Sequence, residues 1–169
     1  RIGDTAAILW TVYLGVTVAC ILALHLAGMS WLDAICHAFS AMSLGGYSTR
    51  DASIGGFDSW AIEMVLTFFM VLAAMNFATH FTAWHDRSLR PYWRDAEARG
   101  VLGLLALSCL GCGAYLWYLG TYPDPLSALR YVTFNLVSIA TTTGYASTDY
   151  EAWPLFVPFF MLFLSAITS

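Results

Sequence analysis

The feature that most constrains this chain is a run of 25 residues without a formal charge, at positions 5–29. Such a run is long enough to cross the roughly 30 Å hydrocarbon core of a bilayer as one helix. Three further apolar stretches follow, at 60–84, 101–119 and 152–169. Only 11% of the residues are charged, whereas soluble domains carry about 25%. The sequence therefore predicts an all-α membrane protein.

Two segments between these runs contain an apolar piece too short to cross a bilayer, followed by a polar stretch with glycine. They read MSWLDAICHAFSAMSLGGYSTRDAS (29–53) and YPDPLSALRYVTFNLVSIATTTGYASTD (122–149). Ser30 and Asp33 fit a capping box, and Asp124 followed by Pro125 is typical of a helix start. A helix over 30–42 would be roughly 18 Å long. We therefore expect two re-entrant half-helices, each followed by a loop at membrane depth.

The two glycine stretches align when the first is shifted by 98 residues (144 − 46). Four identities result, which pair Ser40 with Ser138, Gly46 with Gly144, Tyr47 with Tyr145 and Asp51 with Asp149. The order of span, half-helix, glycine stretch and span recurs as well. The chain is therefore predicted to be two copies of one unit, over 1–84 and 101–169, joined by a loop over 85–100.

Non-helical backbone inside a membrane leaves carbonyl groups unpaired, which is costly unless another group satisfies them. Backbone carbonyls can replace the water shell of a cation, and glycine permits the dihedral angles that turn them inward. The carboxyl end of each half-helix adds a negative dipole. We expect the glycine stretches to hold a dehydrated cation, with Tyr47 and Tyr145 packed behind the loops.

The arginines set the predicted orientation. Four of them lie close together at positions 87, 90, 94 and 99, which places the loop over 85–100 in the cytoplasm. The half-helices then enter from outside, where an acidic rim would concentrate cations. For any single rim residue, an ordinary solvated charge is an equally good explanation. The rim consists of Asp51, Asp58, Asp124, Asp149 and Glu151, set against Arg50 and Arg130. No basic stripe indicates nucleic-acid binding.

Several polar residues in apolar surroundings keep two other functions open, because such groups inside a membrane are candidates for function. One is a helical membrane enzyme or redox protein whose His and Cys side chains bind metal or haem. The other is a membrane scaffold that transports nothing. No two histidines are four residues apart, and the Cys109–Cys112 pair lacks a second ligand pair, so we expect no enzyme. The polar residues are His25, His37, Glu63, Asn76 and His80.

The segments LDAICHAFSAMSLGGYSTRDAS (32–53) and ATTTGYASTDYEAWPLFVP (140–158) resemble the Trk/Ktr/HKT superfamily of cation transporters, especially its TrkH-like subunits. RIGDTA (1–6) and RPYWRDAE (90–97) extend the resemblance over nearly the whole chain. It implies four M1–pore-helix–M2 repeats, of potassium-channel-like architecture, around one pathway for K⁺ uptake across the bacterial inner membrane. It implies no organic cofactor, but a homodimer and a cytosolic nucleotide-binding regulatory subunit.

The resemblance also assigns residues. It makes Gly46 and Gly144 the filter glycines of the second and third repeats, with K⁺ held by their carbonyls and those of the neighbouring residues. The missing repeats of the same transporter would complete the ring, so we expect the chain to be a fragment. The glycine-rich gate of the family is expected beyond Ser169. The neighbouring filter residues are Leu44, Gly45, Tyr47, Thr142, Thr143 and Tyr145.

Overall fold

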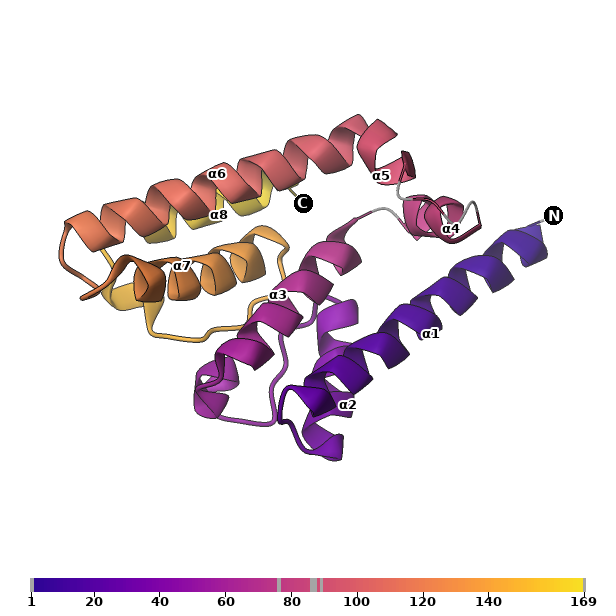
Figure 1. Cartoon of the computed structure of the whole chain (residues 1–169), viewed down its shortest axis with the longest axis horizontal. Coiled ribbons are helices and arrows are strands. Elements are labelled where there is room, and N and C mark those ends of the chain that lie inside the picture. Colours follow the sequence, from indigo (N-terminus) through magenta and orange to yellow (C-terminus); the bar gives the residue numbers. More distant parts are fainter. Residues whose placement is uncertain (1, 76, 86–87, 89, 169) are drawn as a thin grey trace.

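The computed structural model describes residues 2–168 except 76, 86, 87 and 89, and in that part of the chain every regular element is helical. The first unit contains α1 (Ile2–Leu26), α2 (Trp31–Met42), the short η1 (Ser53–Phe57) and α3 (Trp60–Ala74). The second repeats this order with α6 (Ala96–Tyr118), α7 (Pro125–Ala140), η2 (Tyr150–Ala152) and α8 (Phe156–Thr168). Figure 1 shows the two units side by side, joined through α4 (Phe77–His85) and α5 (Arg90–Arg94). The all-α prediction is confirmed.

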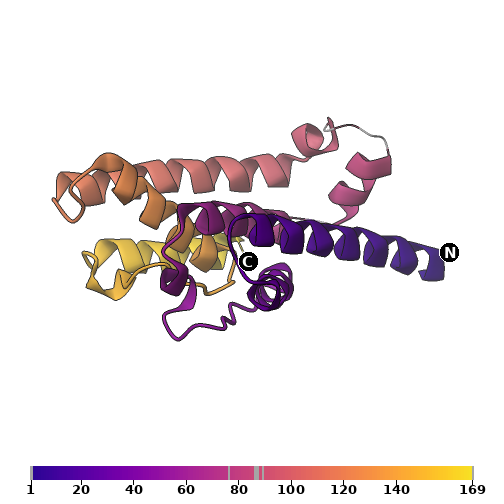
Figure 2. The ribbon, with the colours of Figure 1, turned by 60° about the horizontal axis from the view of Figure 1, so that its bottom comes forward.

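The first helices of the two units are the long ones. Among the described residues, Ala6–Leu26 and Ala96–Tyr118 are long and apolar enough to cross a membrane, whereas α3 and α8 are apolar but shorter. In Figure 2, α1 and α6 run from the same end of the molecule in roughly the same direction. This common direction is what two copies of one unit in a single membrane require.

The predicted span over 60–84 is not one continuous helix, because the structure divides it into α3 and α4. Helix α3 ends at Ala74, and Met75 is extended, with ψ 157°. At 1.5 Å per residue, α3 is about 22 Å long, which is shorter than the bilayer core. The carbonyl of Leu72 has no partner within the helix, because α3 ends there. It accepts a hydrogen bond from Met75 N (3.1 Å) and contacts His80 Nε2 (2.8 Å). The prediction placed His80 within the same span, but it lies on the next helix.

The fourth span also begins later than predicted. Helix α8 starts at Phe156, so Pro154 precedes it and Pro158 lies in its first turn. Amide groups in the first turn have no partner within the helix. Pro158 therefore removes no helical hydrogen bond there, and it need not bend the helix. Two residues named in the sequence analysis, Asn76 and Arg87, lie outside the described residues.

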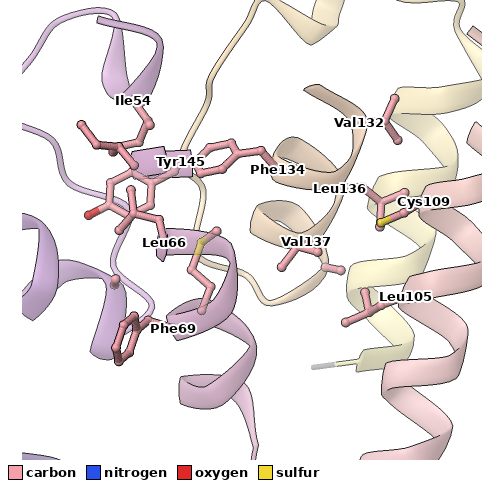
Figure 3. Packing of buried hydrophobic residues seen from close by; sticks show 14 of the residues in the cluster. Ile54, Leu66, Phe69, Leu105, Cys109, Val132, Phe134, Leu136, Val137 and Tyr145 are labelled. Atoms are coloured by element: carbon pink, nitrogen blue, oxygen red, sulfur yellow. The ribbon is translucent and has the colours of Figure 1, made fainter. Parts of the chain in front are cut away.

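One hydrophobic core runs through both units. Figure 3 shows Tyr145 and Phe134 of the second unit against Ile54 and Leu66 of the first. All four side chains are fully buried. The shared core fixes α7 and its following loop against the first unit, and so positions the two glycine loops relative to each other.

Candidate functional site

Each half-helix is capped as its sequence predicts. Ser30 Oγ accepts a hydrogen bond from Asp33 N (3.1 Å) at the start of α2. Asp124 Oδ1 accepts one from Ser127 N (2.8 Å) at the start of α7, where Pro125 occupies the first turn. These caps satisfy amides that the helix itself cannot. The half-helices therefore begin at defined residues and end at the glycine loops.

The two glycine loops have the same backbone conformation, at the spacing of 98 residues that the sequence gives. Gly45 N donates to Ser40 O (2.8 Å), and Thr143 N donates to Ser138 O (2.9 Å). Backbone φ is positive at Gly46 (67°) and Gly144 (90°), and two positions earlier at Leu44 (52°) and Thr142 (60°). Alternating left-handed residues change the direction of successive carbonyls. The predicted glycine conformation is confirmed.

The loops also touch. A Cβ atom built on Gly46 would lie 2.2 Å from Thr143 O and 3.1 Å from the carbonyl carbon of Gly144. No side chain fits at that distance, so glycine is required by contact as well as by φ. At Gly144 the same construction meets no atom within 4 Å in the described chain. The backbone at Gly46 therefore lies close to that of Thr143 and Gly144.

The chain beyond each loop adds further contacts between the units. Gly55 N donates to Ala146 O (3.1 Å), and Ala146 N donates to Ser53 Oγ (3.2 Å). A Cβ on Gly55 would lie 2.8 Å from Ser147 O. These contacts join the segment after one loop to the segment after the other, which holds the two loops in a fixed relation.

The two tyrosines have different environments. Tyr145 is fully buried, and its hydroxyl lies 3.2 Å from both His37 O and Tyr47 O, to which it can donate. It therefore packs behind the loop of the first unit, as expected. Tyr47 is 82% exposed, so the expectation that it packs behind a loop is wrong for this chain. In the described chain, no element packs over Tyr47 in the way that the first unit packs over Tyr145.

A polar side chain on each half-helix contacts the segment after the loop. His37 Nε2 lies 2.9 Å from Ser48 Oγ, and its Nδ1 lies 2.7 Å from Asp33 O. Asn135, at the equivalent position, accepts from Ser147 N (3.1 Å) and donates to Ser147 Oγ (2.9 Å) and Tyr131 O (2.8 Å). His37 and Asn135 thus connect half-helix to loop.

One equivalent pair of serines behaves differently. Ser40 Oγ accepts a hydrogen bond from Tyr47 N (2.7 Å), which fixes the backbone just beyond Gly46. Ser138 is fully buried, and its Oγ has no hydrogen-bond partner among the described residues. The first loop is therefore held by a side-chain bond that the second lacks.

Glu63, whose ion-binding role the sequence left open, is paired instead. Its carboxylate accepts hydrogen bonds from Arg130 Nη2 (2.7 Å) and Nε (2.9 Å). Asp58 lies 3.3 Å from the same guanidinium. Nothing in the sequence indicates this pairing, except that each charge interrupts an apolar segment.

The residues proposed for a metal or redox site do not come together. Within the described part of the chain, no group of three or more His, Cys, Asp and Glu side chains is placed to hold a metal ion. All four cysteines are free, and three of them are buried. Cys109 and Cys112 lie on the buried face of α6, as expected for residues that pack against other helices.

Comparisons with known proteins agree with this arrangement. The TrkH family, described as cation transport proteins, matches residues 1–111. The Trk system potassium uptake protein TrkH of Halomonas elongata is 45% identical over 169 residues, which cover 100% of this chain and 35% of that protein. The TrkH of Vibrio parahaemolyticus is 43% identical, over 99% of this chain and 35% of that one.

A solved structure is similar as well. The crystal structure of the potassium transporter TrkH from Vibrio parahaemolyticus matches with a TM-score of 0.93 and 42% identity. The match covers 97% of this chain and 36% of that chain.

The fold and the paired loops define a helical membrane protein built from repeated pore-helix units. More particularly, the chain belongs to the TrkH family of cation transport proteins. It spans about a third of the length of the relatives it matches (35%). The resemblance found in the sequence is confirmed, and the relatives are transport proteins rather than enzymes.

Proposed function

We propose that residues 44–47 and 142–145 form two of the segments of a potassium-selective filter in a protein that takes up K⁺ across the bacterial inner membrane. The observation that supports this most is the contact of Gly46 with the backbone at Thr143 and Gly144. It puts two loops of carbonyl oxygens, far apart in sequence, next to each other.

The chemistry of these loops suits an alkali cation. Their available ligands are main-chain carbonyls and threonine hydroxyls, and oxygen ligands of this kind are preferred by hard cations. Each loop follows the carboxyl end of a half-helix, where the helix dipole is negative. The filter carbonyls would be those of Leu44, Gly45, Gly46, Tyr47, Thr142, Thr143, Gly144 and Tyr145.

The loops are also restrained by hydrogen bonds. Hydrogen bonds of the helix ends, Ser40 and Asn135 restrain the backbone on the side of each half-helix. Loops that resist closing onto a smaller ion would favour K⁺ over Na⁺. Gly45 stands where the second loop has Thr143, so the two segments offer different side-chain oxygens.

Two loops enclose only part of an ion. In the proposed protein, further repeats of the same transporter supply the remaining carbonyls. The loops face outside, and residues 85–100 lie in the cytoplasm, where a nucleotide-binding regulatory subunit acts on a homodimer. The relatives named Trk system potassium uptake protein support the choice of K⁺ as the ion.

The proposal is tested by a change at Gly144 in the full-length protein. Gly144→Ser places a side chain on a residue with φ 90°, which disturbs the carbonyls without a new contact in the described chain. We expect a reduced preference for K⁺ over Na⁺, measured as fluxes in proteoliposomes and as growth at limiting K⁺. The matched control is Gly111→Ser, on an exposed face of α6 with no atom within 4 Å of the added Cβ.

The control should leave both fluxes unchanged. A Gly144→Ser protein with normal uptake and normal ion preference would contradict the filter assignment and favour a scaffold that does not transport.

A further inference from the structure

The bidentate ion pair between Arg130 and Glu63 joins the two units. Arg130 lies on α7, the half-helix of the second unit, and Glu63 on α3 of the first. The Glu63 side chain is 1% exposed and the Arg130 side chain 20% exposed. A buried carboxylate with two hydrogen bonds from one guanidinium has a fixed geometry, because the two planar groups match in only a few orientations.

The pair fixes the outer end of α7. Asn135 lies further along the same helix and holds Ser147 beyond the loop. At the other end of α7, the Thr168 hydroxyl donates to Ala140 O. A rotation or shift of α7 would therefore move the carbonyls at 142–145 relative to those at 44–47, and Arg130 is the charged contact that opposes it.

This pairing is not a general property of the repeat. With the spacing of 98 residues, Arg130 corresponds to Leu32, which is 69% exposed, and Glu63 corresponds to Met161, which is 1% exposed. The first half-helix thus has an apolar residue where the second has a cation. The ion pair is therefore specific to the contact between these two units. The equivalent residues, Leu and Met, are suitable neutral substitutes for Arg130 and Glu63.

We infer that Arg130 and Glu63 are a positioning pair for ion selectivity: they set the distance between the two loops of the proposed filter without touching the ion. The inference rests on the proposed function. It is distinct from an electrostatic role at the outer mouth, because the Glu63 carboxylate is buried and already neutralised by the guanidinium.

The test uses the full-length protein in proteoliposomes with four variants: Arg130→Leu, Glu63→Met, the two combined, and the control Glu97→Gln. We expect each single variant to lower the K⁺ over Na⁺ flux ratio by roughly tenfold, within the range for residues that interact directly. The double variant should recover most of the ratio, because it leaves no unpaired buried charge. Glu97→Gln, at an exposed carboxylate on α6, should leave the ratio unchanged.

Other results separate the possibilities. Fewer folded molecules with an unchanged flux ratio and unchanged KM for K⁺ would show a purely structural role and overturn the inference. A double variant as impaired as Arg130→Leu alone would assign the effect to the positive charge rather than to the pair. If the unmodified protein showed no K⁺ flux, the proposed function itself would be contradicted.

Discussion

The loop after α2 and the loop after α7 have the same backbone but different supports. His37 contacts one serine hydroxyl in the first unit, whereas Asn135 bonds both the amide and the hydroxyl of Ser147 in the second. Ser40 Oγ holds the first loop, while Oγ of its counterpart Ser138 has no hydrogen-bond partner among the described residues. The repeated conformation therefore does not depend on one particular set of side chains.

What the loops share is the backbone that ends each half-helix. The carbonyls of Ser40 and Ser138 accept hydrogen bonds from Gly45 N and Thr143 N in the same way, and positive φ recurs two residues apart in both. The conformation follows from the helix end and the glycine, and the side chains behind it adjust its stability. Changes at equivalent positions should therefore have unequal effects.

The largest difference is expected between the two glycines. Gly46→Ala adds a contact of 2.2 Å with Thr143 O to the strain of a positive φ, whereas Gly144→Ala adds the strain alone, about 1–2 kcal/mol. We expect the Gly46 variant to lose K⁺ uptake and thermal stability, and the Gly144 variant to retain more of both. Equal losses in uptake and in thermal unfolding would show that the two loops do not pack as described.

The next largest effect is expected at the residues that connect half-helix and loop. Asn135→Ala leaves the Ser147 amide and hydroxyl without a partner, at about 1–3 kcal/mol for a buried polar group. His37→Ala removes the contacts with Ser48 Oγ and Asp33 O, but it leaves no backbone amide beyond the loop without a partner, so it should cost less.

Thermal unfolding of the full-length protein in detergent measures both changes. His37→Asn serves as a control, since asparagine already fills this position in the second unit. A His37→Ala protein less stable than Asn135→Ala would reverse the comparison.

The serine pair should give a smaller difference. Ser40→Ala removes the acceptor of Tyr47 N and should cost about 1 kcal/mol. Ser138→Ala removes a buried hydroxyl that has no partner in the described chain, so its effect should be near zero or slightly stabilising. Unfolding midpoints of the two variants check this; a destabilising Ser138→Ala would reveal a partner for that hydroxyl.

The smallest effect concerns the helix caps. The Ser127 amide and hydroxyl lower the pKa of Asp124 below its ordinary value. A lowered folded-state pKa means that the carboxylate stabilises the protein above the unfolded pKa, about 3.9, and that this contribution disappears as the pH falls through the folded value. Asp124→Asn, which keeps a capping oxygen, should therefore have a smaller loss of stability between pH 6 and pH 3 than the unmodified protein. Identical pH profiles would exclude the carboxylate from the cap.

Much of this arrangement could be predicted from the sequence, because it depends on local patterns. Uncharged runs predicted the long helices, and Ser30 and Asp124 predicted where the half-helices start. The spacing of 98 residues gave the equivalent loops. Each of these signals lies within a short stretch of the chain.

The remaining features depend on contacts between distant residues. The end of α3 at Ala74 occurs within an apolar run, where composition gives no sign of a break. The pairing of Arg130 with Glu63 and the burial of Tyr145 across the unit boundary require knowledge of how the units pack. Tyr47 is likewise exposed because no other element packs against it, and the residues around it in the sequence do not indicate this.

The most direct test of the central claim is to locate the ion. The full-length protein, crystallised with Rb⁺ or Tl⁺ in place of K⁺, should show anomalous density beside the carbonyls of Gly46 and Gly144, and Gly144→Ser should weaken it. An active protein whose only anomalous density lies away from both glycines would contradict the account.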